Sequence, residues 1–240
     1  MDTMTAFPPL TALGAIPGAL LGAASAVTAR LRRDKPLHPV GHVATGRLTI
    51  LRPQPDLGVQ ALAGPGTVTC VARWSRAMGL PPGWPDIEGL ALRLHGVGAG
   101  GGDGDLLFAS TGTRAWSRFL LTLRPPGTFG PVTTLLPVRA GDRAVTFRLT
   151  PAIDPSPSDE GMPPATYELA VARGTGAWLT VGRVDLQWSL DDTAERFDPI
   201  THELAGIEQF PVVTGLRQPA YVAARAVARA RPTTEKRSHA

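Results

Sequence analysis

The side chains best suited to acid–base or metal chemistry are scattered along this chain. His38 and His42 stand four residues apart, a spacing that would place both imidazoles on one face of a helix, but Pro39 and Gly41 argue against a helix there. Neither an H-E-x-x-H nor a C-x-x-C spacing occurs. A hydrolytic metal site, such as a phosphodiesterase would use, therefore requires long-range assembly. The candidate ligands for it are His38, His42, Asp86, His95, Asp103, Asp105, His202, Glu203 and Glu208.

A glycine-rich run, GVGAGGGDG at 96–104, invites comparison with a phosphate-binding loop. It lacks the G-K-[S/T] ending, and no helix with a dinucleotide fingerprint follows it. The sequence therefore predicts a flexible connection between two strands.

The chain has one cysteine, Cys70, so neither an intrachain disulfide nor an all-cysteine metal site can form. The residue lies in a strand-like run, where we expect a small buried apolar side chain. This usage fits a reducing compartment, and we expect a cytoplasmic protein.

Arginine accounts for almost all of the basic charge, since Lys35 and Lys236 are the only lysines. The net charge of +4 and a pI near 10.0 raise the question of nucleic-acid binding. The arginines are spread singly, so we expect no nucleic-acid partner. They either solvate the surface or hold a small anionic molecule.

The elements that position these residues are mainly strands, because 27 glycines and 24 prolines among 240 residues disfavour a helical protein. In Thr67–Ser75, Val68, Cys70, Ala72 and Trp74 alternate with Arg73 and Ser75, which lie on the opposite face. Alternation or strand-like composition predicts further strands at Val43–Leu51, Gly89–His95, Ala144–Thr150, Thr166–Arg173 and Val184–Leu190. Many short strands favour a closed barrel or a sandwich.

Helices are predicted at Thr113–Leu123, from its apolar spacing, and at Pro219–Arg231. The uncharged run at 10–29 contains many small residues and Pro17, so we expect a packed helix at about 18–29 rather than a membrane span. That helix is the best candidate for a contact in a homo-oligomer. The predicted organisation is an N-terminal helical segment at 1–34, a barrel domain with a C-terminal helix at 35–231, and a disordered tail at 232–240.

Several short motifs occur in a fixed order. They are HPVGHVATG at 38–46, ARWSRAMG at 72–79, DIEGLAL at 86–92, Asp105-Leu106, VGRV at 181–184, FDP at 197–199, AGIE at 205–208 and RQPAY at 217–221. In this order they resemble the haem catalase family, whose chains carry H-x-x-G-x-x-x-x-G, V-R-F-S-x-x-x-G, D-P-R-G-F-A-V and F-D-P…P-G-I-E…R-x-x-x-Y. The resemblance spans roughly residues 35–225 of a chain shorter than is usual for the family. It implies a mainly β fold with flanking helices, the catalase-like antiparallel β-barrel.

The resemblance also implies a haem b cofactor whose iron is bound by Tyr221 as a tyrosinate. Arg217 matches the arginine that stabilises the phenolate, and Arg225 continues the Tyr221 face of a regular helix. Arg73 and Lys35 match cations that meet the haem propionates.

On the distal side His38 matches the histidine that moves a proton between the two peroxide oxygens, and Ser75 matches the hydroxyl that orients this imidazole. The family's distal asparagine falls at Ser110 by an ungapped count from Asp105-Leu106. A hydroxyl at this position favours peroxidase-like chemistry on hydrogen peroxide or organic hydroperoxides over full catalase activity. Two alternatives stay open: a binding or structural protein of the same fold without productive haem, and the metal-dependent hydrolase.

Overall fold

The described part of the chain consists of antiparallel strands joined by short turns. The computed structural model describes residues 41–78, 80–81, 83–152, 162–189 and 197–209. The helices predicted at 18–29 and 219–231 and the tail at 232–240 lie outside these residues.

The strands within that part are β1 (Gly41–Ile50), β2 (Gly66–Arg76), β3 (Glu88–Leu94), β4 (Gly104–Ser110), β5 (Val132–Thr133), β6 (Val138–Ala140), β7 (Arg143–Pro151), β8 (Thr166–Arg173), β9 (Leu179–Ser189) and β10 (Ile207–Glu208). Single 3-10 turns occur at η2 (Pro55–Leu57), η3 (Gln60–Leu62), η4 (Ala99–Gly101) and η5 (Ser117–Phe119). All six predicted strands are confirmed, and the glycine-rich run is the β3–β4 connection that contains η4.

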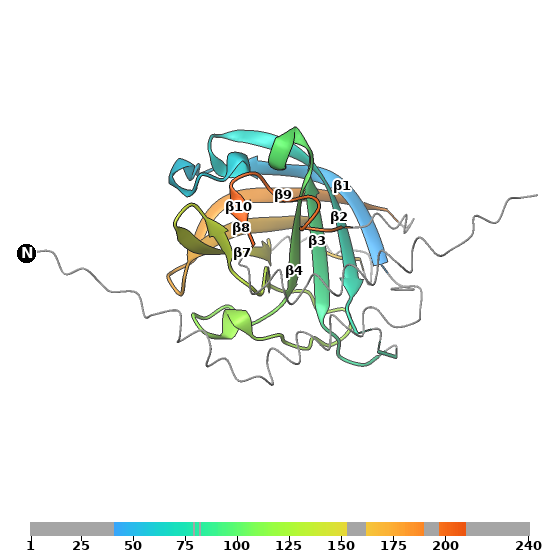
Figure 1. Cartoon of the computed structure of the whole chain (residues 1–240). Helices are drawn as coiled ribbons and strands as arrows, with labels where there is room; N and C mark the ends of the chain where they lie inside the picture. Colours follow the sequence, from blue (N-terminus) through green and yellow to red (C-terminus); the bar gives the residue numbers. More distant parts are fainter. Residues whose placement is uncertain (1–40, 79, 82, 153–161, 190–196, 210–240) are drawn as a thin grey trace, which may run out of the picture.

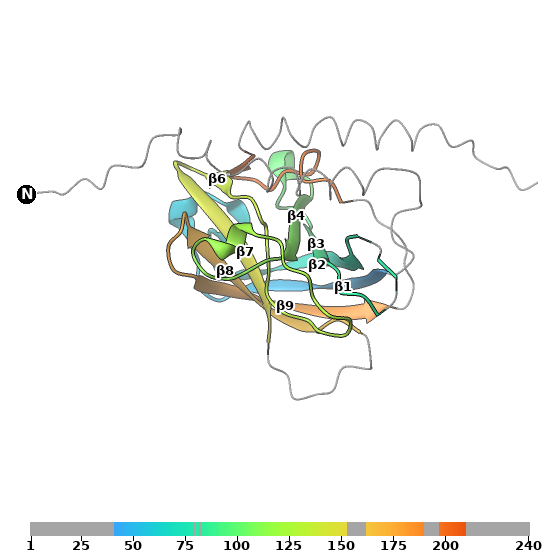
Figure 2. The same ribbon diagram turned by 90° about the horizontal axis from the view of Figure 1, so that it is seen from below.

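Eight of these strands close into an antiparallel barrel (Figures 1 and 2). The order around it is β1-β2-β3-β4-β5-β7-β8-β9, and β9 pairs again with β1. β6 pairs with β7, and β10 extends the sheet beyond β6. Closure removes the free edges that β1 and β9 would otherwise present.

The apolar stripes predicted from alternation point into this barrel. On β1 and β2 the pairs Ala44–Ala72 and Leu48–Val68 face the lumen, and across the barrel Phe147 and Leu149 are about 1% exposed or less. Burying one such side chain contributes roughly 1.5–3 kcal/mol. The lumen of this barrel is therefore its hydrophobic core rather than an open channel.

The helix predicted over Thr113–Leu123 is wrong. Only η5 forms there, and Thr111 and Leu121 make an isolated antiparallel bridge. The apolar side chains that the helix was expected to bury have no surface to pack against, since Trp116 is 77% and Leu123 58% exposed. Side-chain periodicity alone does not hold a short helix without such packing.

Candidate functional site

Arg73 and Ser75 lie together on the outer face of β2, as the alternation predicted. The pleat sends Cys70, Ala72 and Trp74 into the lumen, so the residues between them point outward. Arg73 and Ser75 are half-buried.

The outer face around Ser75 carries almost no bulky side chains. The strand register places Ser75 between Gly41 of β1 and Gly89 of β3, and Gly89 opposite Ala109 of β4. The next row along the strands holds Val43, Arg73, Ala91 and Leu107. We call these eight residues the outer platform. It is a mostly apolar patch with one hydroxyl and one guanidinium.

Ser110 lies on the opposite face of the sheet from this platform. Because Ala109 faces outward with Gly89, Ser110 points inward, and its residue is 0% exposed. The hydroxyl accepts a hydrogen bond from the Glu88 backbone N–H at 3.1 Å and donates one to the Thr122 carbonyl at 2.6 Å. The structure therefore does not bring Ser110 together with Ser75, and the residue of β4 that faces the platform is Ala109.

The other predicted site residues lie outside the described part of the chain: Lys35, His38, Arg217, Tyr221 and Arg225. His38 precedes Gly41, the direct partner of Ser75, by three residues. Three extended residues span at most about 11 Å, so chain length permits His38 to reach the platform.

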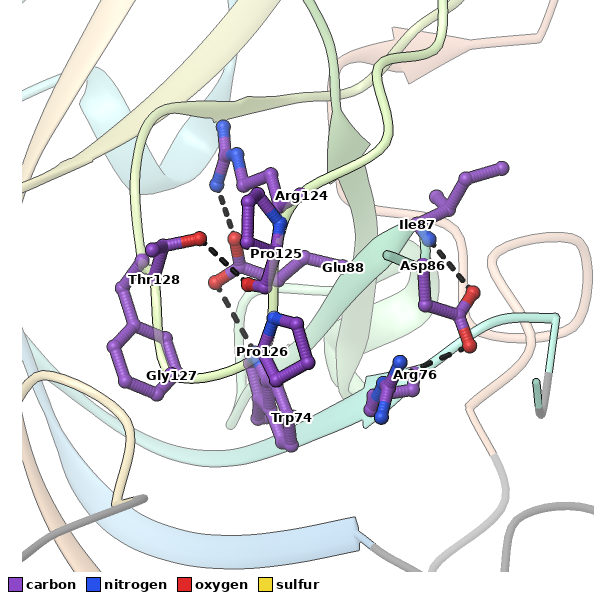
Figure 3. A pocket seen from close by; sticks show the side chains of 11 residues that line it. Trp74, Arg76, Asp86, Ile87, Glu88, Arg124, Pro125, Pro126, Gly127 and Thr128 are labelled. Carbon is purple, nitrogen blue, oxygen red and sulfur yellow. Dashed lines mark hydrogen bonds and ion pairs between the residues drawn. The ribbon is translucent and has the colours of Figure 1, made fainter. Parts of the chain in front are cut away.

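A small cavity of about 110 Å³ opens at the end of the barrel near the start of β3 (Figure 3). Its walls are Trp74, Arg76, Asp86, Ile87, Glu88, Arg124 and the loop 125–129. Arg76 forms an ion pair with Asp86 at 3.6 Å, and the Asp86 carboxylate also accepts the Met78 N–H at 2.9 Å.

Glu88 is the buried acid of this cavity, with the residue 4% exposed. Its carboxyl accepts hydrogen bonds from the Trp74 indole N–H at 3.1 Å and from Arg124. Burial raises the pKa of Glu88, and the charge of Arg124 opposes that shift. Tyr167, 1% exposed, extends into the same end of the core, and burial and the charge of Glu88 raise the pKa of its phenol.

Glu88 is not among the functional residues expected from the sequence. A signal was present, because Glu88 is in phase with Leu90, Leu92 and Leu94, the lumen-facing residues of β3. An acid in the apolar register of a strand requires a buried partner, and here that partner is Arg124 from the loop after η5.

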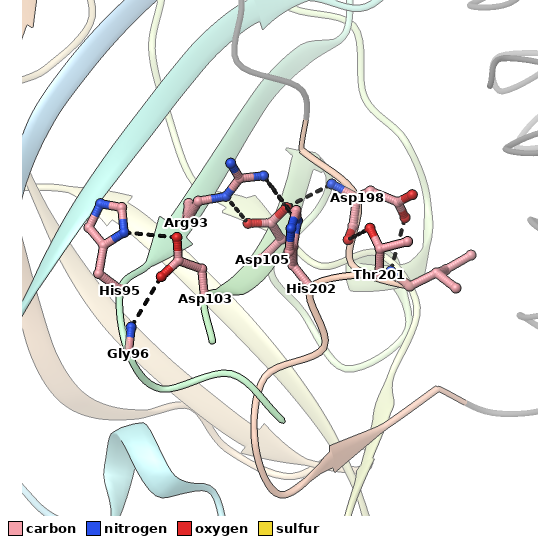
Figure 4. A network of polar contacts seen from close by, with 9 residues as sticks. Arg93, His95, Gly96, Asp103, Asp105, Asp198, Thr201 and His202 are labelled. Atoms are coloured by element: carbon pink, nitrogen blue, oxygen red, sulfur yellow. Dashed lines mark hydrogen bonds and ion pairs between the residues drawn. The ribbon is translucent and has the colours of Figure 1, made fainter. Parts of the chain in front are cut away.

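A second buried acid, Asp105, organises a polar network on the outer face of β3 and β4 (Figure 4). Its fully buried carboxylate accepts two hydrogen bonds from Arg93, at 2.8 and 2.9 Å. It also accepts the Asp198 backbone N–H at 2.7 Å and lies 3.2 Å from Nδ1 of His202. Two of the sequence motifs, Asp105-Leu106 and the FDP run, are therefore in direct contact.

Within residues 41–209, apart from the gaps given above, no group of three or more His, Cys, Asp or Glu side chains could hold a metal ion. In the same part of the chain, no helix is both long enough and apolar enough to cross a membrane.

The comparisons with known proteins agree on fold only. No protein-family model matches the chain, and no curated protein matches it in sequence. Among solved structures, a fungal catalase superimposes with a TM-score of 0.57 at 13% identity over 94% of this chain. Catalase A from Saccharomyces cerevisiae gives 0.55 at 13% identity over 93%.

The chain spans about two thirds of those catalases, covering 65% and 66% of their lengths. At such low identity the likeness establishes architecture and not chemistry. The order of strands, the closure of β9 on β1 and these superpositions together show that the chain has the catalase-like antiparallel β-barrel fold.

Proposed function

We propose that this protein binds haem and reduces hydrogen peroxide or organic hydroperoxides, as a peroxidase-like enzyme rather than a full catalase. The observation that supports this proposal is the outer platform of a catalase-like barrel, where Ser75 and Arg73 face outward beside Gly41, Gly89 and Ala109.

The small side chains and the guanidinium of the platform support the proposal that one side of a haem lies against it. A macrocycle is flat and apolar, and four adjacent outward positions carry no side chain larger than hydroxymethyl. Haem carries carboxylates at one edge, and Arg73 in the next row supplies a cation for one of them. The described residues thus fit the distal side of the group.

The residues for the proximal side would come from the C-terminal segment. Tyr221 would bind the iron through its phenolate, and Arg217 would lower the pKa of that phenol by charge. Arg225 follows one turn later if the segment is helical, and Lys35 would meet the second propionate. Bound there, the iron would supply the redox chemistry of peroxide reduction.

The protein's own part in the reaction is proton transfer. His38 would take a proton from one peroxide oxygen and return it to the other, which assists heterolytic cleavage of the O–O bond. Ser75 would hydrogen-bond the imidazole and fix its orientation, since no hydrogen bond to another described residue occupies its hydroxyl.

The residue that β4 contributes to the platform is consistent with slow peroxide reduction. Ala109 offers no polar group to peroxide, and the Ser110 hydroxyl is bound to two backbone groups on the other face. Without a hydrogen-bond donor there, His38 would be the one proposed side chain that contacts the peroxide. This same observation favours the second candidate, a binding protein of this fold without productive haem.

Haem titration of the purified full-length chain separates the two functions. We expect one haem per chain with a Soret band, and Tyr221→Phe should abolish tight binding. Tyr167→Phe is the matched control, because Tyr167 is the only other tyrosine and its hydroxyl lies in the core. His38→Ala should keep the haem and lower peroxide consumption about 10²–10⁴-fold.

If the wild-type chain takes up no haem, the peroxidase proposal is wrong and the binding protein without productive haem is the function that remains. Full haem occupancy in Tyr221→Phe would remove Tyr221 as the ligand, and unchanged rates in His38→Ala would remove His38 from proton transfer.

A further inference from the structure

The outer face of β7 carries a second unusual group of polar side chains, two strands away from the outer platform. Thr146, Arg148 and Thr150 are successive outward residues of this strand. The register places Arg148 opposite Thr133 of β5, which in turn is opposite Ala109. We call Thr146, Arg148 and Thr150 the β7 outer row.

Each member of the β7 outer row has a buried polar atom without a hydrogen-bond partner among the described residues. These atoms are Oγ1 of Thr146, Nε of Arg148 and Oγ1 of Thr150. A buried polar atom left unsatisfied costs about 1–3 kcal/mol, and such atoms are rare in folded proteins. Three such atoms on successive outward residues of one strand leave hydrogen-bonding capacity that a bound group could satisfy.

A second guanidinium and an indole flank the row. The Arg118 and Arg148 guanidinium carbons lie 4.3 and 4.7 Å from the centre of the Trp178 ring. Arg118 donates to the carbonyls of Gly174 at 3.3 Å and Gly176 at 2.9 Å, so its position is fixed by the β8–β9 turn. The Trp178 indole N–H donates to the Thr113 carbonyl at 2.7 Å.

The positive charge here is not neutralised by a contacting acid. Arg148 forms no ion pair within the described chain, and Glu168 acts on it only through space. Burial, together with the charge of Arg118, lowers the pKa of Arg148. Two guanidinium groups that repel each other around one indole favour an anion between or beside them.

Exposure differs along the row. Arg148 and Thr150 are half-buried as residues, although the Arg148 Nε and Thr150 Oγ1 atoms are themselves buried, and Thr146 is 0% exposed. A solute would approach through the exposed part of Arg148 and Thr150. A guanidinium edge presents two parallel N–H donors that match the oxygens of a carboxylate or phosphate, and a threonine hydroxyl adds a third donor.

We propose that Arg148 and Thr150 form a binding site for a small oxyanion, a carboxylate or a phosphate. Arg118 is a fixed neighbouring cation of this site, and the Trp178 ring lies beside both guanidinium groups. This site is separate from the proposed peroxide site and does not require haem.

Isothermal titration of the haem-free full-length chain with inorganic phosphate, and separately with acetate, tests the site at constant ionic strength. We expect saturable binding of at least one of them, and the better ligand identifies the class. Arg148→Gln should weaken it about tenfold or more, and Thr150→Val less. Arg143→Gln is the matched control, since Arg143 begins the same strand and pairs with exposed Asp56 at 3.3 Å.

A near-UV circular dichroism spectrum unchanged in Arg148→Gln shows that the variant is folded. Trp178 gives an independent readout, because phosphate or acetate beside its ring should alter fluorescence in wild type and not in Trp178→Phe. Equal affinity in Arg148→Gln and Arg143→Gln, or no saturable binding of either anion to wild type, would overturn the proposal.

Discussion

Glu88 shows how one residue ties the core to a loop. It occupies the lumen register of β3, yet its carboxyl is held by the Trp74 indole and Arg124. Arg124 also donates to the Pro131 carbonyl, so the loop 124–131 is fastened across the barrel end. Removing one partner of such a buried pair leaves the other charge uncompensated.

The raised pKa of Glu88 predicts a pH dependence of stability. The folded protein keeps the carboxyl proton to higher pH than the unfolded chain, whose value is near the usual 4.5. The contribution of Glu88 is therefore full below about pH 4.5 and declines as pH rises through the folded pKa. Urea unfolding between pH 4 and 8 should show wild type losing free energy of unfolding relative to Glu88→Gln. A difference that grows in favour of wild type with rising pH contradicts this assignment.

Cys70 behaves as an apolar side chain, as the sequence predicted. The residue is 2% exposed, and burial raises the pKa of its thiol from 9.0 to about 12. The native protein then carries roughly a thousandfold less thiolate at pH 8 than an exposed thiol would. We expect slow labelling by a thiol reagent in buffer and rapid, stoichiometric labelling in denaturant. Complete labelling of the native chain within minutes would place the thiol at the surface.

At the scale of elements, β1 and β9 approach each other closely at Gly46. Gly46 pairs with Leu186, and a Cβ added to Gly46 would lie 2.1 Å from the Asp185 carbonyl oxygen. Only glycine permits this approach, which explains why a glycine stands inside a strand at this position.

Gly46→Ala should therefore lower the free energy of unfolding by about 3 kcal/mol, because the strands must move apart. Gly64→Ala is the control, as nothing lies within 4 Å of the added Cβ, and it should change stability by less than about 0.5 kcal/mol. Guanidinium denaturation measures both. Equal midpoints for the two variants would show that β1 and β9 can separate freely.

The Asp105 network joins the segment at 197–204 to the outer face of β3 and β4. Asp105→Ala should cost about 3–5 kcal/mol, since Arg93 would lose its buried partner. Asp142→Ala removes a carboxylate that is 92% exposed and 3.5 Å from Arg143, so it should cost less than about 1 kcal/mol. Thermal or urea unfolding measures the free energy of unfolding of both variants. If Asp105→Ala loses no more of it than Asp142→Ala, the network does not stabilise the fold.

At the scale of the whole molecule, the barrel is closed by long-range pairing. β1 lies between β2 and β9, strands separated by more than one hundred residues in sequence. Since every barrel strand has two neighbours, loss of packing in one place weakens the entire ring, and unfolding should be cooperative.

Phe147→Ala tests this cooperativity at a side chain that is 1% exposed. We expect a loss of about 3–5 kcal/mol and coincident transitions by far-UV circular dichroism and tryptophan fluorescence. Leu51→Ala, at a residue 67% exposed, should change stability by less than about 0.5 kcal/mol. Separate transitions for the two probes would mean that the barrel unfolds in parts.

The sequence by itself determined the positions of six strands (β1, β2, β3, β7, β8 and β9), the mainly β class and the faces of β2. These follow from a period of two, which the pleat imposes on neighbouring residues regardless of what lies far away. The opposite faces of Cys70 and Ser75 were predictable for this reason, and the motif order pointed to the catalase-like barrel. Asp105 and the FDP run were visible as motifs, although their contact was not.

Only the tertiary structure decided which distant residues meet. Which face of β4 carries Ser110 depended on the register of β4 against β3, which an ungapped motif count does not fix. The apolar side chains spaced along 113–123 had no surface to pack against, so the predicted helix did not form. The Glu88–Arg124 pair and the Arg118–Trp178–Arg148 group join segments that are 30 to 60 residues apart. Such contacts arise from barrel closure, because the free energy of long-range pairing, and not local periodicity, selects them.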